Sequence, residues 1–96
     1  MHSKRDRLSI IAFVLENLRE FRGLTELMYK TRLDTRTATK YLRLLTYNGL
    51  VTCLDYGNGN KRYIITEKGI KFLSLYNELI GIINLNQYNN LDNIID

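Results

Sequence analysis

The sequence of 96 residues contains no proline, no tryptophan, and only one cysteine and one histidine. The single cysteine, Cys53, excludes a disulfide within the chain and any metal site built from several thiolates. No stretch approaches the roughly 18 consecutive apolar residues that indicate a membrane-spanning helix. We therefore expect no metal, no cofactor and no membrane partner, and we expect the protein to reside in the cytoplasm.

The side chains that catalysis requires are also scarce. The one histidine, His2, precedes the first predicted helix, and Cys53 falls within a predicted strand. No pair of carboxylates has a spacing suited to acid–base chemistry, and no glycine-rich loop has the pattern that cradles phosphate. The sequence therefore predicts a protein that is not an enzyme.

Acidic residues are few in the middle of the chain. Residues 30–68 contain three acids, Asp34, Asp55 and Glu67, against eight basic side chains. From Phe72 onward the balance reverses, with three acids and no lysine or arginine. A basic middle segment is typical of a protein that binds a polyanion, although an ordinary solvated surface would also carry such charges.

Hydrophobic periodicity and turn residues predict six elements. Helices are expected at residues 4–22, 25–31, 35–48 and from 67 onward, and strands at 50–56 and 61–65. Gly23 is expected to end the first helix. The predicted fold is mainly α with a small β-hairpin, in the order ααα-ββ-α, and the hairpin turns at residues 57–60. The expected N-caps are Ser3, Thr25, Asp34 and Thr66.

A short helix, a tight turn and a longer helix form a helix-turn-helix, and a glycine-tipped hairpin after it makes the winged variant. The major groove of DNA admits one α-helix, and a basic hairpin can lie along the backbone beside it. The predicted DNA-binding residues of the turn and the third helix are Arg32, Thr35, Arg36, Thr37, Thr39, Lys40, Arg43 and Tyr47. Those of the 51–65 hairpin are Asn58, Lys61 and Arg62. Tyr29, Tyr41 and Tyr63 are expected in or beside the core.

The last predicted helix is apolar over about 180° of its circumference, whereas a helix that lies on one domain needs only ~100°. One stripe has coiled-coil spacing and is expected to contact a second copy, with antiparallel pairing favoured. The members of this dimer stripe are Leu73, Tyr76, Ile80, Ile83 and Gln87. The other stripe, Phe72, Leu75 and Leu79, is expected to pack on the protein's own domain. This divides the chain into a DNA-binding domain, residues 1–66, and a dimerisation helix, residues 67–96; the alternative is a monomer.

Three stretches carry a resemblance to a known family: KRDRLSIIAFVLE at 4–16, MYKTRLDTRTATKYLRLLTYNGLV at 28–51 and YIITEKGIKFLSLYNEL at 63–79. Together they resemble archaeal winged-helix DNA-binding proteins, which include small chromatin-associated dimers with a C-terminal antiparallel coiled coil. The resemblance implies a dimer that binds duplex DNA with the third helix and the wing, and an archaeal or archaeal-virus source. The last helix departs from the family pattern, because it is rich in asparagine and poor in charge beyond Tyr76.

These observations favour a dimeric regulator of transcription that binds double-stranded DNA and is associated with the nucleoid. Two alternatives stay open, a winged-helix module for protein–protein interaction and a non-specific, chromatin-type coat for DNA. The basic third helix and hairpin favour DNA over a protein partner. Duplex RNA is a weaker alternative, because its narrow major groove does not admit a helix.

Overall fold

A computed structural model describes residues 6–83 of the chain. The four helices are α1 (Arg7–Asn17), α2 (Leu24–Thr31), α3 (Thr35–Tyr47) and α4 (Glu67–Ile83). The two strands are β1 (Val51–Asp55) and β2 (Lys61–Ile65), paired antiparallel. The predicted fold class, mainly helical with one small hairpin in the order ααα-ββ-α, is confirmed.

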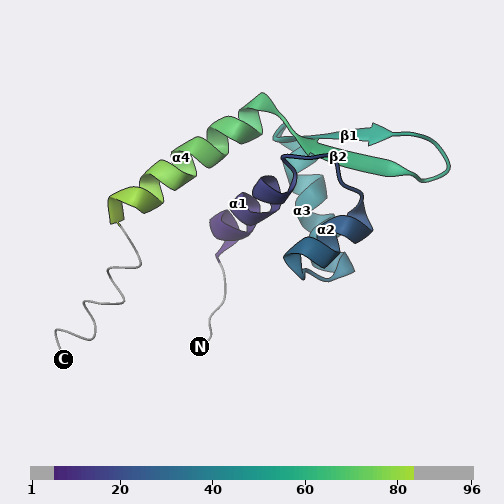
Figure 1. The fold of residues 1–96 in the computed structure, drawn as a ribbon, viewed down its shortest axis with the longest axis horizontal. Helices are drawn as coiled ribbons and strands as arrows, with labels where there is room; N and C mark the ends of the chain where they lie inside the picture. Colours follow the sequence, from purple (N-terminus) through teal and green to yellow (C-terminus); the bar gives the residue numbers. More distant parts are fainter. Residues whose placement is uncertain (1–5, 84–96) are drawn as a thin grey trace.

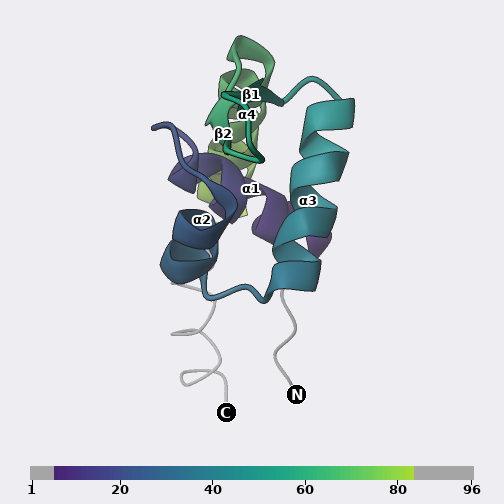
Figure 2. The same cartoon turned by 90° about the vertical axis from the view of Figure 1, so that its right-hand side faces the viewer.

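One apolar core holds the elements together. Helix α1 packs against α2, α3 and α4, and its side chains Leu15 and Leu18 are fully buried. Leu27 of α2, Leu45 of α3 and Leu73 of α4 reach the same core. Figure 1 shows the consequence for shape, since the hairpin extends from one end of this core and α4 extends toward the other. Figure 2 shows α2 and α3 on either side of α1.

Helix α1 ends earlier than its periodicity predicts, at Asn17 rather than residue 22. After the C-cap Leu18, the chain crosses to the hairpin, where Arg22 and Tyr63 exchange two backbone hydrogen bonds of 3.0 and 2.8 Å. The predicted role of Gly23 as the end of the first helix is therefore wrong, because this residue is the N-cap of α2. The N-cap of α1 is Asp6, whose carboxylate accepts from the Ser9 N–H at 2.7 Å.

Two predicted caps of the first two helices remain, Thr25 and Ser3. Thr25 is not a cap, since α2 begins at Leu24, one residue before it. Ser3, the expected cap of the first helix, lies outside the described residues. Within residues 6–83, no helix is long and apolar enough to cross a membrane.

The hairpin turns where the glycine-rich sequence predicts. The register runs from Val51 opposite Ile65 to Asp55 opposite Lys61. Residues 57, 58 and 59 all have positive φ, a conformation that glycine adopts freely and asparagine tolerates. The turn is closed by the Tyr56 N–H, which donates to the Asn60 carbonyl at 2.8 Å.

The start of α4 is fastened to the end of α3. The Thr66 hydroxyl donates to the Gly49 carbonyl at 2.6 Å and accepts from the Gly69 N–H at 3.1 Å. Thr66 therefore caps α4, as the sequence predicts. The Lys68 ammonium donates to the Asn48 carbonyl at 2.8 Å. Gly69 lies so close to β1 and β2 that a Cβ there would stand 2.4 Å from the Leu50 carbonyl oxygen. These contacts therefore fix the position of the start of α4 relative to the end of α3.

Candidate nucleic-acid interface

Helix α3 separates cleanly into a buried and an exposed side. Its buried residues are Ala38, Tyr41, Leu42 and Leu45. At about 100° per residue, the side chains that lie opposite them are Arg36, Lys40, Arg43 and Tyr47, and all four are exposed. Tyr47 is 90% exposed, so its ring is available to an external partner. The structure thus brings these four predicted site residues together on one face.

The first turn of α3 is fixed by its N-cap. The Asp34 carboxylate accepts a hydrogen bond of 2.7 Å from the Thr37 N–H, as the sequence predicts. This hydrogen bonding, together with the nearby positive charge of Arg36, lowers the pKa of Asp34. The cap therefore holds the beginning of α3, and with it Thr35 and Arg36, in a defined orientation.

The cations of α3 are not neutralised by the rest of the described chain. Within residues 6–83, no ion pair involves Arg36, Lys40 or Arg43. The Lys40 ammonium lies 5.7 Å from the centre of the Tyr41 ring, a cation–π contact that leaves its charge intact. An anion that approaches α3 would therefore meet three cations with no acidic competitor on the same face.

The predicted threonines flank this face rather than occupy its centre. Thr35 is exposed, and its hydroxyl lies 3.6 Å from the Met28 sulfur, to which it donates. Thr37 and Thr39 are half-buried, on opposite sides of the helix. The hydroxyls at these three positions therefore border the cationic face, and they can contact only the margin of a ligand that is centred on this face.

A groove of 440 Å³ separates α3 from the hairpin. Two cations border it, Arg43 from α3 and Lys61 from β2, and no carboxylate lines it. Burial, with Cys53 beside the ring, raises the pKa of the Tyr63 phenol, so this hydroxyl is a neutral donor near physiological pH. The other lining residues are Leu24, Thr39, Leu42, Thr46, Tyr47 and Cys53.

The participation of Thr46, Cys53 and Tyr63 in this groove was not predicted, because the sequence does not reveal which face of the hairpin meets α3. The pairing register decides it. Side chains alternate along a strand, so Lys61 and Tyr63 share the face that looks toward α3.

The two predicted cations of the hairpin lie on opposite faces. Arg62 points away from Lys61, and its guanidinium lies 3.9 Å from the Glu26 carboxylate of α2. Both groups are about half exposed, so this pair is weak. Asn58 stands exposed at the tip of the hairpin, with φ of 55°. Lys61 therefore borders the groove beside α3, whereas Arg62 lies beside α2.

Arg32 occupies the left-handed conformation at the end of α2, with φ of 62°. Glycine is the usual residue at such a position, because a residue with a side chain adopts this conformation only at a cost in free energy. The exposed Arg32 therefore lowers the stability of the turn relative to glycine. The neighbouring Tyr29 is 83% exposed. Its predicted place in or beside the core is wrong, because Tyr29 lies about 200° around α2 from the buried Leu27.

The two apolar stripes of α4 do not face entirely as the sequence predicts. Leu73, expected to contact a second copy, is 1% exposed and belongs to the protein's own core, so that assignment is wrong. Leu75 and Leu79, expected to pack inward, are each more than half exposed, so this assignment is also wrong. Gln87 lies outside the described residues.

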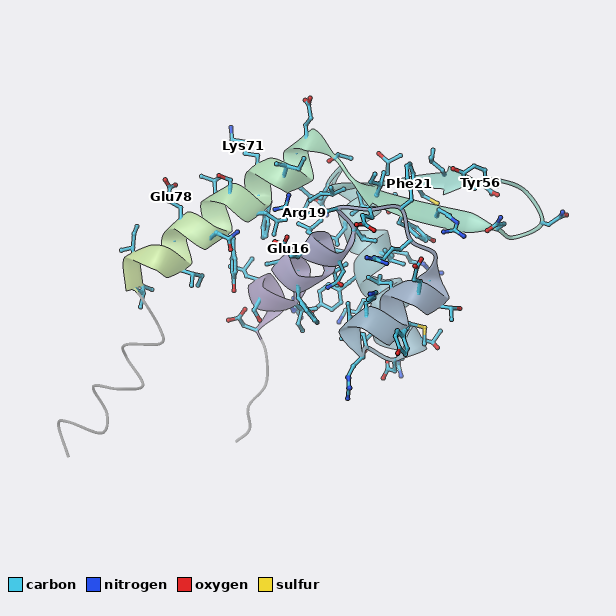
Figure 3. All side chains as sticks on the ribbon, in the orientation of Figure 1. Glu16, Arg19, Phe21, Tyr56, Lys71 and Glu78 are labelled. Atoms are coloured by element: carbon cyan, nitrogen blue, oxygen red, sulfur yellow. The ribbon has the colours of Figure 1, made fainter. Side chains whose placement is uncertain are left out.

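Phe72, expected to pack inward, is half-buried against the core, as predicted. In the predicted dimer stripe, Tyr76 and Ile80 are half-buried and Ile83 is 56% exposed. Figure 3 shows Lys71 and Glu78 on the side of α4 that faces away from α1. The exposed Leu75, Leu79 and Ile82 recur at four- and three-residue steps beside them.

The described residues offer no site for a metal, since no three histidine, cysteine, aspartate or glutamate side chains gather among residues 6–83. What the arrangement provides is a cationic helix face, a groove beside it and a hairpin with one further lysine directed to the same side. Such a surface can bind an anion that is long enough to contact both elements.

Comparison with known proteins gives one family and several similar structures. A family model described as winged helix-turn-helix matches residues 4–84. The chain is similar to Sso10a-2, a DNA-binding protein from Sulfolobus solfataricus, at 29% identity, with a TM-score of 0.78 and coverage of 94% of this chain and 93% of that one. No curated protein sequence matches the chain.

Two structures below 25% identity share the fold. A PadR family transcriptional regulator from Eggerthella lenta is 22% identical, with a TM-score of 0.75 and coverage of 88% of this chain and 83% of that one. The transcriptional regulator YodB from B. subtilis is 18% identical, with a TM-score of 0.64 and coverage of 80% and 76%.

Proposed function

The chain belongs to the winged helix-turn-helix family, and from that premise we propose that it is a regulator of transcription that binds double-stranded DNA. Helix α3 enters the major groove, and the β1–β2 hairpin lies on the backbone beside it. A helix with its side chains is about 10–12 Å wide, which fits the ~12 Å major groove of B-DNA. The proposed location is the cytoplasm, on the nucleoid.

The observation that carries this proposal is the set of unpaired cations on one face. Arg36, Lys40 and Arg43 are exposed and lack carboxylate partners within the described residues, and Lys61 adds a fourth charge across the groove. Two elements that carry like charge toward a common groove are suited to a polyanion with regular spacing. A protein-binding surface would more often present apolar or acidic side chains there.

The proposed roles follow from position. Arg36, Lys40 and Arg43 reach base edges and phosphates, and Tyr47 contacts the backbone at the end of α3. Lys61 and Asn58 contact phosphates from the hairpin. The flanking hydroxyls of Thr35, Thr37 and Thr39, and the Arg32 side chain at the start of the turn, contact the strand beside α3. Arg62 contributes only long-range charge, because it lies on the face of the hairpin opposite Lys61, beside Glu26 of α2.

We also propose that two chains pair through α4. The exposed stripe formed by Leu75, Leu79 and Ile82 has coiled-coil spacing, and a monomer would leave these side chains in water. Full burial of a leucine or isoleucine contributes about 1.5–3 kcal/mol, so half-exposed residues on two chains offer a substantial gain on association. Antiparallel pairing is the arrangement that the family resemblance implies, and it is part of this proposal.

The DNA assignment is tested by a fluorescence-anisotropy titration of a labelled duplex at two salt concentrations, with an unlabelled single strand as competitor. With about six phosphate contacts, affinity should fall roughly 10³-fold between 50 and 200 mM salt, and the single strand should not displace the duplex. Absence of binding even at low salt would contradict the proposal and favour a protein-interaction module.

Two single substitutions that each lower the net charge by one unit separate the α3 face from the total charge. Lys40→Gln and Asn77→Glu change the net charge equally, but Asn77 is exposed on α4, on the side away from Leu75, Leu79 and Ile82. Lys40→Gln should weaken binding and lower the slope of log affinity against log salt concentration by about 1, whereas Asn77→Glu should change binding little. Equal effects of the two changes would mean that α3 is not the binding face.

The dimer is tested with Leu79→Glu, matched by Asn77→Glu on the opposite side of α4. Both residues are exposed and both variants gain one negative charge. Light scattering at micromolar concentration should give twice the chain mass for the unmodified protein and for Asn77→Glu, and a monomer for Leu79→Glu. A monomeric unmodified protein would refute the pairing.

A further inference from the structure

The side-chain acceptors that α3 offers to a ligand are threonine and tyrosine hydroxyls, and no side chain of α3 combines a carbonyl acceptor with an N–H donor. Residues 35–47 contain no asparagine, glutamine, aspartate, glutamate or histidine. The polar groups at its two ends are already engaged, since the Asp34 carboxylate accepts from the Thr37 N–H and the Asn48 side-chain amide donates to the Leu44 carbonyl. The strong hydrogen-bonding groups on the exposed face are therefore the three cations Arg36, Lys40 and Arg43.

This composition limits which base edges α3 can recognise. In the major groove, a bidentate reading of adenine needs an asparagine or glutamine, because adenine presents one donor and one acceptor. Cytosine presents an amino group, for which a carboxylate is the usual acceptor and a threonine hydroxyl offers only a single hydrogen bond. Guanine presents two acceptors, O6 and N7, which match the two parallel N–H groups of an arginine fork. Guanine is thus the only base for which α3 carries a bidentate partner.

The spacing of the two arginines adds a geometric condition. Arg36 and Arg43 lie on the same face, seven residues apart, which places their Cα atoms about 10.5 Å apart along the helix axis. A zinc-finger helix reads three successive bases with side chains spread over a similar length. Two arginines at this separation can therefore reach two base pairs that have one or two pairs between them, with Lys40 located between the two.

Resting on the proposed DNA binding, we propose that α3 reads two guanines, one by Arg36 and one by Arg43, separated by one or two base pairs. The two arginines are thus the residues that determine specificity, and the threonines add only contacts to thymine methyl groups or phosphates. Such a protein is selective for short guanine-containing sites, but it discriminates poorly among the bases between them.

The preference for two guanines is tested by using the full chain to select bound duplexes from a randomised pool. Guanine should be enriched at two positions with the stated separation. In the selected duplex, each of these guanines is then replaced singly by 7-deazaguanine, which removes the N7 acceptor and preserves base pairing. Each replacement should weaken binding of the unmodified protein roughly 2- to 10-fold, because it removes one of the two hydrogen bonds of a bidentate contact that is worth about 5- to 150-fold in total.

Arg36→Lys and Arg43→Lys provide the matched test, because each keeps the charge and loses the fork. Arg36→Lys should reduce the effect of 7-deazaguanine at one position only, and Arg43→Lys at the other only, because a lysine has no planar fork to hold both acceptors in fixed geometry. Circular dichroism of both variants should show an unchanged helix content.

Three other outcomes overturn the inference. Salt-dependent binding without guanine enrichment, or without sensitivity to 7-deazaguanine, refutes guanine reading and leaves the proposed DNA binding intact. Lysine variants that weaken all duplexes alike would mean that the arginines contact phosphates only. No binding to any duplex at low salt refutes both this inference and the proposed function.

Discussion

Replacement of Gly69 by alanine sets two physical effects against each other. Helix propensity alone favours alanine over glycine by up to about 1 kcal/mol, so α4 by itself would be stabilised. The structure predicts the opposite sign. A Cβ at residue 69 would lie 2.4 Å from the Leu50 carbonyl oxygen and 2.6 Å from Cγ1 of Ile65. Both distances are well below van der Waals contact.

The clash is difficult to relieve, because its nearest atom belongs to the backbone. The Leu50 carbonyl also accepts the Thr66 N–H at 3.0 Å, so moving it would weaken the junction that starts α4. Overpacking of this kind costs about 1–3 kcal/mol. After a propensity gain of up to about 1 kcal/mol is subtracted, we expect Gly69→Ala to destabilise the protein by up to about 2 kcal/mol, or as much as roughly 16 °C in melting temperature.

Gly81→Ala is the matched control, since Gly81 lies in the same helix and its Cβ would meet nothing within 4 Å. This variant should be stabilised by up to about 1 kcal/mol. The assay is thermal and urea unfolding followed by circular dichroism, at one protein concentration, because association also contributes to apparent stability. If Gly69→Ala were as stable as Gly81→Ala, the close approach of α4 to β1 and β2 would be refuted.

Three further predictions concern α2 and α3. Arg32→Gly should raise stability by about 0.5–1 kcal/mol, because glycine adopts the left-handed conformation freely, and should weaken DNA binding; a loss of stability in urea unfolding would contradict the first part. Thr31→Val should cost about 1–3 kcal/mol, because the buried hydroxyl accepts the Leu33 N–H at 3.3 Å and donates to the Leu27 carbonyl at 2.8 Å, whereas Thr31→Ser should cost less. Asp34→Ala should lower the free energy of unfolding at pH 7, where the Asp34 carboxylate is charged. This loss should shrink as the pH falls below about 4 and through the lowered pKa of Asp34, because protonation removes the charge that the cap contributes. A loss that does not depend on pH in unfolding titrations would show that the carboxylate charge plays no part.

The elements that the sequence predicted well are those with strong local signals. Asp34 and Thr66 are caps because each side chain accepts an N–H three residues later, a relation that depends only on nearby residues. The hairpin turn is similar, since three successive residues with positive φ follow directly from Gly57-Asn58-Gly59. The exposed face of α3 could also be predicted, because its apolar and its cationic residues each recur at three- or four-residue steps and so lie on opposite sides of the helix.

The predictions that failed depended on contacts between distant segments. The spacing of Leu18 and Phe21 is compatible with a longer first helix, but pairing of Arg22 with Tyr63 draws the chain into the sheet. Similarly, α4 has two apolar stripes, and periodicity does not say which one faces inward. Anchoring of Thr66 and the close fit of Gly69 fix the rotation of α4 about its axis, and that rotation buries Leu73 and exposes Leu75 and Leu79.

The fastening of Lys68 and Thr66 to the last residues of α3 also has a consequence for operator architecture. Without a flexible linker at this junction, the distance and angle between the two α3 helices of the proposed dimer would be set by where its two copies of α4 cross. Binding sites on the same side of B-DNA recur about every 34 Å, so only certain half-site spacings would suit both subunits. Insertion of one residue into α4 would turn its stripe by about 100° and put the two subunits out of phase with the double helix. A protein that reads few bases individually could thus still discriminate between operators by their spacing.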